Sequence, residues 1–76
     1  MNIEECTYRN LGHNVRKYRL MRGLSQEKLS ELLDTNSKFI GHAERFERYI
    51  SLKKLIQLAN ILDVPLWQFF IFNDDK

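Results

Sequence analysis

The sequence is poor in the residues that build several common kinds of protein site. It has one cysteine, Cys6, so no disulfide can form within the chain. A metal site made from Cys6 and His13 would lack the two further ligands that structural zinc takes, so we expect no metal and no cofactor. The three glycines do not form a glycine-rich phosphate-binding loop.

Long hydrophobic runs are also absent. No stretch of about 18 apolar residues could span a membrane, so we expect no membrane contact. The first six residues are polar and acidic, without the apolar centre of a signal peptide. These observations predict a cytoplasmic protein.

The side chains that could do catalysis are scattered. His13 and His42 have no nearby Asp, Ser or Cys at a helical spacing that would make a catalytic group. Glu27 and Glu31 lie four residues apart, and a solvated pair on an exposed helix face is the simpler explanation. Because 76 residues leave room for one small core and no large cleft, we predict that the protein is not an enzyme.

The pattern of apolar residues is helical throughout, with no alternation typical of a strand. We expect one domain over residues 1–76, with its core at about 8–72, and disorder from Asn73 to Lys76. The first helix should run from Thr7 or Asn10 to Arg22, and Gly23 should end it. The later helices should begin after Ser25, Asn36 and Ser51, and at Pro65, the last of them ending near Ile71.

The expected helices have apolar faces that predict the core. Leu29, Leu32 and Leu33 should be buried in the second helix. The fourth helix should bury six side chains: Leu52, Leu55, Ile56, Leu58, Ala59 and Leu62. Leu66, Phe69 and Phe70 should close the core.

The stretch from Ser25 to Glu44 predicts two short helices joined by a turn at Asp34 to Asn36, which is a helix-turn-helix unit. In the second of these helices Ile40 and Ala43 should face inward. Ser37, Lys38 and His42 should then face outward, and small, polar and basic groups on a free helix face suit a DNA major groove.

The charge of the chain is uneven although the formal net charge is only +2. The span from Arg9 to Lys54 holds eleven Lys and Arg but five Asp and Glu, which gives a local charge of +6. A basic centre between acidic ends can attract phosphate groups.

Several motifs, in this order and spacing, resemble one family. They are Arg19-Leu-Met-Arg-Gly-Leu-Ser-Gln-Glu-Lys-Leu-Ser30, Ile40-Gly-His-Ala-Glu-Arg45, Ser51-Leu-x-x-Leu55 and Leu58-Ala-x-x-Leu-Asp-Val-Pro-Leu66. The sequence is similar to the Cro/C1-type (XRE) helix-turn-helix regulators over about Leu11 to Phe70. The resemblance implies an all-α, compact five-helix, phage-repressor-like domain. It also implies a sequence-specific regulator of transcription that binds double-stranded DNA.

The chain departs from the family pattern at four positions. The family usually has glycine at Asp34, and it often has glycine at Phe46, proline at Ile50 and a polar residue at Trp67. The pattern after Glu44, without the proline, also resembles the small controller proteins of restriction–modification systems.

The resemblance assigns roles to individual residues. Base-reading candidates are Ser37, Lys38 and His42, with Phe39 able to pack on a thymine methyl group. Arg19 and Glu44 should form a structural pair that fixes the angle of the reading helix. Phosphate candidates are Gln26 at the start of a helix, together with Arg16, Arg22, Arg45, Arg48, Lys53 and Lys54.

The C-terminal segment predicts self-association. Trp67, Ile71 and Phe72 are left over on a helix too short to bury every side, and exposed aromatic groups often mark an interface. A homodimer would present two reading helices to a near-palindromic operator. RNA polymerase is a further possible partner of such a regulator.

A second function stays open for the same fold. The apolar C-terminal face could bind a partner protein, as in an antitoxin that covers a toxin.

Overall fold

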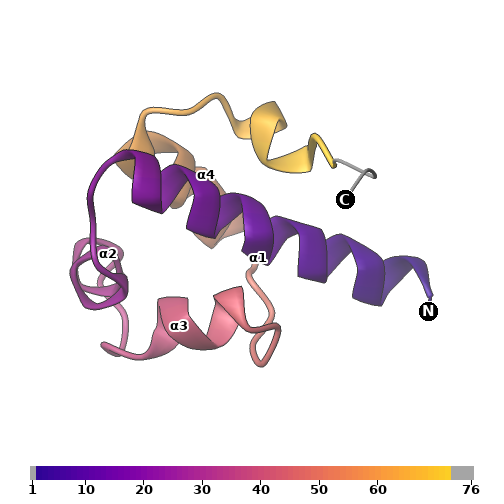
Figure 1. Cartoon of the computed structure of the whole chain (residues 1–76), viewed down its shortest axis with the longest axis horizontal. Coiled ribbons are helices and arrows are strands. Elements are labelled where there is room, and N and C mark those ends of the chain that lie inside the picture. Colours follow the sequence, from indigo (N-terminus) through magenta and orange to yellow (C-terminus); the bar gives the residue numbers. More distant parts are fainter. Residues whose placement is uncertain (1, 73–76) are drawn as a thin grey trace.

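The computed structural model describes residues 2–72. In this part of the chain there are four α-helices, one 3₁₀ helix and no strand. The expectation for residues 73–76 lies outside the described residues. The all-helical prediction is confirmed, but the expected fifth α-helix is wrong, since a 3₁₀ helix takes its place (Figure 1). The elements are α1 (Ile3–Met21), α2 (Gln26–Leu32), α3 (Phe39–Glu44), α4 (Leu52–Leu62) and η1 (Leu66–Phe70).

The first helix starts earlier than the sequence analysis predicts. The Asn2 side chain accepts a hydrogen bond from the Glu5 N–H at 2.7 Å, which caps α1 one residue before Ile3. Glu4 and Glu5 lie in the first turn, where negative charge is favourable. Cys6 is therefore exposed on a helix.

All four α-helices end in the same way. A residue with positive φ follows each helix: Gly23 (69°), Asp34 (63°), Phe46 (65°) and Asp63 (58°). The next N–H then bonds back five residues, as from Thr35 to the Ser30 carbonyl oxygen at 3.0 Å. This is the Schellman geometry, which satisfies carbonyl groups that a helix end leaves free. Asp34 and Phe46, where the family has glycine, thus lie at positions with positive φ, the conformation that glycine adopts most easily.

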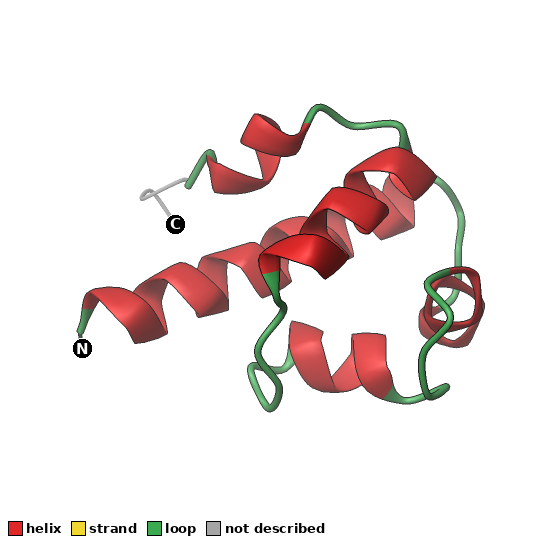
Figure 2. Cartoon of the chain, turned by 180° about the vertical axis from the view of Figure 1, so that it is seen from behind, coloured by secondary structure: helices red, strands yellow, loops and turns green. Residues whose placement is uncertain are grey.

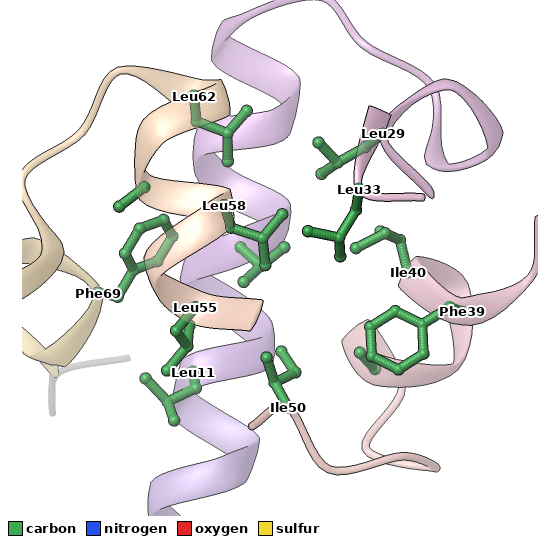
Figure 3. Close-up of a cluster of buried hydrophobic side chains, with 13 residues drawn as sticks. Leu11, Leu29, Leu33, Phe39, Ile40, Ile50, Leu55, Leu58, Leu62 and Phe69 are labelled. Carbon is green, nitrogen blue, oxygen red and sulfur yellow. The ribbon is translucent and has the colours of Figure 1, made fainter. Parts of the chain in front are cut away.

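The buried side chains gather between α4, α1 and the two short helices (Figure 3). Several residues predicted to be buried are not in this cluster. Leu32 is 46% exposed, Leu52 59%, Ile56 50% and Phe70 42%. The sequence pattern therefore predicts more buried positions than the packing of the helices provides. The core comprises Leu11, Val15, Leu29, Leu33, Phe39, Ile40, Ala43, Ile50, Leu55, Leu58, Ala59, Leu62 and Phe69.

The 3₁₀ helix η1 lies along α1 on the side away from α3 (Figures 1 and 2). Phe69 enters the core fully, and its carbonyl oxygen accepts a bond of 2.6 Å from the Asn14 side-chain amide. The same amide also donates to the Ile71 carbonyl oxygen at 3.1 Å. Asn14 thus satisfies two carbonyl groups at the end of this segment.

None of the helices over residues 2–72 combines the length and the apolar character that a membrane crossing requires.

Candidate nucleic-acid interface

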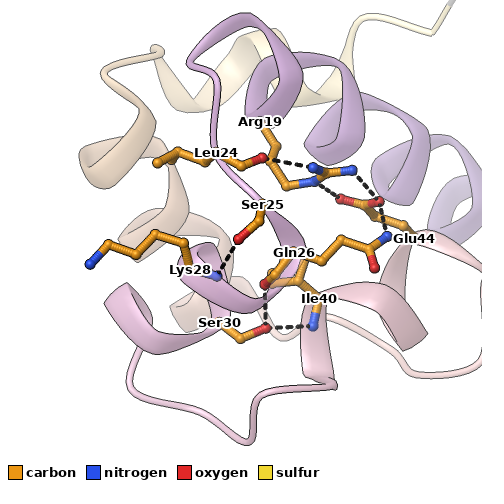
Figure 4. Close-up of polar contacts among 8 residues, drawn as sticks. All are labelled: Arg19, Leu24, Ser25, Gln26, Lys28, Ser30, Ile40 and Glu44. Carbon is orange, nitrogen blue, oxygen red and sulfur yellow. Dashed lines mark hydrogen bonds and ion pairs between the residues drawn. The ribbon is translucent and has the colours of Figure 1, made fainter.

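The Arg19 and Glu44 side chains form the pair that the resemblance implies. Arg19 Nε donates to Glu44 Oε2 at 2.7 Å, and Arg19 Nη2 donates to Glu44 Oε1 at 3.1 Å (Figure 4). Arg19 Nη1 donates to the Leu24 carbonyl oxygen at 2.8 Å. Both side chains are buried. Two parallel bonds from a planar guanidinium fix both distance and angle, so the end of α3 is held firmly against α1.

Gln26 extends this network to α2. Its side-chain Nε2 donates to Glu44 Oε1 at 2.9 Å, and the residue is half-buried (Figure 4). Its other side-chain atom, Oε1, would lie 3.0 Å from a Cβ placed on Gly41. Glycine at position 41 therefore lets α3 lie close to the start of α2. The remaining N–H of the Gln26 amide can still donate to another group.

Ser30 makes a second connection between α2 and α3 that the sequence analysis missed. Its hydroxyl donates to the Gln26 carbonyl oxygen at 2.9 Å and accepts from the Ile40 N–H at 3.1 Å (Figure 4). The Ile40 N–H is in the first turn of α3, where no intrahelical acceptor is available. A serine in mid-helix bonded four residues back is a local signal, but nothing in the sequence indicates the second bond.

The segment before α3 presents the residues expected to read bases. The Asn36 side chain accepts from the Lys38 N–H at 2.8 Å, and α3 proper begins only at Phe39, later than predicted. Ser37 and Lys38 therefore lie in the turn and are exposed, and His42 is half-buried. The prediction for Phe39 is wrong: its ring is 7% exposed and belongs to the core. It is not free to pack on a thymine methyl group.

A shallow open hollow of about 460 Å³ lies between the start of α2 and α3. Lys38 and Arg45 bring positive charge to it, and Glu27 brings one negative charge. The hollow thus brings two base-reading candidates, Ser37 and Lys38, together with two phosphate candidates, Gln26 and Arg45. Its lining residues are Ser25, Gln26, Glu27, Ser37, Lys38, Gly41 and Arg45.

Glu47 lies beside two of the expected DNA contacts. Arg45 Nη2 is 3.4 Å from a Glu47 carboxylate oxygen, and His42 Nε2 is 4.0 Å from the same oxygen. All three side chains are at least one third exposed, so solvent screens these contacts. Arg45 can exchange this carboxylate for another anion at small cost.

Arg22 has a structural contact that the sequence analysis did not predict. Its Nε donates to the Leu62 carbonyl oxygen at 2.8 Å, and Nη2 lies 3.7 Å from an Asp63 carboxylate oxygen. These bonds join the end of α1 to the end of α4. Arg22 is thus used to cap α4, on a part of the molecule that does not line the hollow.

The remaining phosphate candidates differ in their surroundings. Arg16 and Lys53 are exposed. Arg48 lies in the loop after α3, with its guanidinium carbon 5.5 Å from the centre of the Phe39 ring. Lys54 Nζ lies 5.9 Å from the same ring centre.

The residues expected at a dimer interface lie around η1. Trp67 is 61% exposed and Ile71 58%, whereas Phe72 is half-buried and packs against the core. Trp67, Ile71 and Phe72 line an open hollow of about 640 Å³ together with side chains of α1, including Tyr18. The apolar surface therefore exists, with Trp67 and Ile71 as its most exposed members.

Among residues 2–72, no group of three or more His, Cys, Asp or Glu side chains could hold a metal ion.

Comparison with known proteins gives a consistent set of relatives. A family model described as helix-turn-helix (HTH_3) matches residues 15–66. The control protein C.SmaI of Serratia marcescens is 45% identical over 66 residues, covering 87% of this chain and 74% of that protein. The restriction-modification controller protein C.AhdI from Aeromonas hydrophila superposes with a TM-score of 0.76 at 33% identity, covering 83% of this chain and 96% of that one. The hypothetical transcription factor NHTF from Neisseria gives a TM-score of 0.80 at 26% identity, covering 86% and 75%.

Proposed function

The chain belongs to the XRE-type helix-turn-helix family of DNA-binding transcription regulators, and we propose that it reads a near-palindromic operator as a homodimer. In this proposal α3 and the turn before it enter the major groove of double-stranded DNA. Membership of the family establishes DNA binding and regulation of transcription. We propose in addition the near-palindromic operator, the entry into the major groove and the homodimer.

The observation that carries the proposal is the network around Glu44. Arg19, from just before the end of α1, and Gln26, at the start of α2, bind this carboxylate at the end of α3. They thereby hold α3 and the two turn residues before it, residues 37–44, which we call the reading segment. Lys38 is left exposed at the open end of that segment. A base-reading side chain needs a firm support and free access, and the two conditions meet here.

The reading segment offers contacts of two kinds. Lys38 can donate to guanine O6 or N7, and Ser37 can either donate or accept at a base edge. His42 follows Lys38 by four residues and lies within α3 itself, where it is a further base-reading candidate. Arg45 and Gln26 line the same hollow as Lys38. In this proposal they contact phosphates, which would set the register of the protein on the duplex.

We propose further that the regulated genes belong to a restriction–modification system. The support is the similarity to the control protein C.SmaI and to the restriction-modification controller C.AhdI. A bound dimer would repress a promoter by covering it. Activation would need a contact with RNA polymerase beside the DNA.

The dimer would use the exposed side chains of Trp67, in η1, and of Ile71, which follows η1. Trp67 and Ile71 are large apolar groups with no cover in the described chain, and burying such groups drives association. A twofold axis would place the two reading segments about 34 Å apart, one turn of DNA.

Selection from random duplexes tests this function. The purified protein is incubated with a pool of random double-stranded DNA at two salt concentrations, and bound duplexes are sequenced. We expect enrichment of a near-palindrome with half-sites about 10 bp apart. Salt-sensitive binding without an enriched sequence would contradict specific reading. Absence of binding even at low salt would favour the protein-interaction function, in which the apolar C-terminal face covers a partner.

A Lys38→Gln variant, put through the same selection, tests the role of Lys38 in base reading. It keeps a polar side chain in the turn and removes the charge. We expect the enriched half-site to lose its preference at one or two positions while weak binding persists, because phosphate contacts remain.

A further inference from the structure

Two cations from different elements lie over one buried ring. The Arg48 guanidinium carbon is 5.5 Å from the centre of the Phe39 ring, and Lys54 Nζ is 5.9 Å from it. Arg48 is in the loop after α3, and Lys54 is in the first turn of α4. Phe39 is the first residue of α3. Two positive charges from separate elements, the loop after α3 and α4, therefore lie near the same ring.

Phe39 differs from the other aromatic rings of the described chain that have a cation nearby. Arg9 lies over Phe46 and Lys17 over Tyr18, one cation to each ring. Phe39 has two, and its own side chain is fixed by the core. A ring that cannot move is a better support for a long flexible side chain than one on the surface.

Neither cation is held by a carboxylate in the described residues. The ion pairs of this part of the chain involve Arg19, Arg22, Lys28, His42 and Arg45, and Arg48 and Lys54 are not among them. Arg48 is exposed and Lys54 is half-buried. Their charges are therefore available to an outside anion, while the ring restricts where the side chains lie.

We propose that Phe39 is a positioning residue that holds Arg48 and Lys54 in place for two DNA phosphates beside the reading segment. The inference rests on the proposed function, since it supposes that this face binds DNA. It gives a DNA-related role to a residue that does not touch DNA.

The physical reason is preorganisation. Arginine and lysine side chains lose much rotational freedom when they bind a phosphate. A ring that already restricts them lowers that loss, so the same contact gives a tighter complex. A cation that lies over a ring keeps its positive charge. Loss of the ring should therefore not change the number of phosphates that the protein contacts.

A double-mutant cycle on a labelled duplex pool of mixed sequence tests the proposal. Arg48→Gln and Lys54→Gln are each measured in the wild type and in Phe39→Leu, over a series of KCl concentrations. In the wild type each charge removal should lower the slope of log K against log salt by about 0.9. Phe39→Leu should lower the affinity about threefold to fivefold without changing the slope. In Phe39→Leu the cost of each charge removal should fall about twofold, so that the two reductions together account for the lost affinity.

Three variants make the result specific. Lys53→Gln removes a neighbouring charge that is not over the ring, so its cost should be the same with and without Phe39. Phe39→Tyr keeps the ring and should restore wild-type affinity. Circular dichroism and thermal unfolding check that each variant is folded, and Phe39→Met replaces Phe39→Leu if the latter is not.

The outcomes separate the two proposals. Additive costs of Phe39→Leu with both charge removals, with duplex binding retained, would overturn the positioning role and leave the DNA-binding function intact. Equal coupling to Lys53 would also overturn it, since that would show a general loss of structure. Absence of duplex binding by the wild type would overturn the proposed function, and the positioning role with it.

Discussion

Arg19 shows how one buried side chain can determine the placement of a surface. Its guanidinium bonds both oxygens of Glu44 and the Leu24 carbonyl oxygen. A buried charge without its partner is costly, so the two residues depend on each other. The pair contributes specificity of arrangement more than net stability, because the removal of two charges from water offsets much of their attraction.

Replacement of Arg19 is therefore expected to be severe. Arg19→Ala leaves the Glu44 carboxylate buried without its main partner, and we expect a loss of about 3 kcal/mol in the free energy of unfolding. Urea denaturation followed by circular dichroism measures this. DNA binding should weaken as well, because the end of α3 is no longer held.

Arg16→Ala is the matched control, since Arg16 is exposed on the same helix. It should change the free energy of unfolding by less than about 0.5 kcal/mol. An Arg19→Ala protein with the urea midpoint of the wild type would contradict the structural role of the pair.

The helix ends are the clearest regularity at the scale of elements. Four helices end with a positive φ and a bond back over five residues, yet only one of the four residues is glycine. Aspartate tolerates this conformation better than most residues, but a negative charge at a helix C-terminus is unfavourable. Asp34 combines both effects at the end of α2.

Asp34→Gly should therefore stabilise the protein. We expect a gain of about 0.5 to 1 kcal/mol, with part from the backbone and part from the charge. Thermal unfolding by calorimetry measures it, and Asp34→Asn separates the two parts because it removes the charge alone. An unchanged or lower melting temperature in Asp34→Gly would show that the Asp34 side chain has a favourable contact.

Much of the arrangement of elements could be predicted from the sequence. Ser25 and Ser51 cap α2 and α4 as expected, with bonds to the N–H groups of Lys28 and Lys54. Gly23 ends the first helix as expected. These features are local, and local side-chain chemistry determines them.

The errors concern interactions between elements. Leu52 and Ile56 fit a helical apolar pattern, but which part of an apolar face is covered depends on how α4 packs on α1. The motif groups Phe39 with the base-reading candidates, whereas the packing of α3 buries its side chain in the core. Arg22 looked like a free cation because nothing in the sequence shows that the end of α4 lies beside it.

The start of α1 is an error of another kind. The Asn2 cap and the acidic residues after it are local signals of a helix N-terminus, and they were present in the sequence. Gly12 is harder to foresee. A Cβ there would lie 2.6 Å from the Ala43 carbonyl oxygen, so the residue lets α3 lie directly on α1, and only the packed structure shows this.

At the scale of the whole molecule, we propose that the exposed side chains of Trp67, in η1, and Ile71, just after it, form the dimer interface. Trp67→Ala with Ile71→Ala should give a monomer at concentrations where the wild type is a dimer. Each truncation of a central apolar anchor is expected to cost about 2 kcal/mol of association free energy. Sedimentation equilibrium over a range of concentrations measures this. Phe72 is left unchanged, because it packs against the core.

Leu52→Ala with Ile56→Ala is the matched control, since these two side chains are about as exposed on α4. It should remain dimeric. The reverse result, with this control monomeric and the Trp67/Ile71 variant dimeric, would move the interface to α4. A wild type that is monomeric at all concentrations would refute the dimer.

Two residues of α1, Gly12 and Asn14, are separated by one position but face opposite sides of the molecule. Gly12 lies against the α3 backbone, and Asn14 binds the end of η1. The helix α1 thus lies between the reading segment and the surface proposed to contact a second copy. In a dimer it would fix the distance between these two surfaces. Because that distance is fixed, the separation of the two reading segments would be fixed as well. A dimer of this chain would therefore tolerate little variation in the spacer between two operator half-sites.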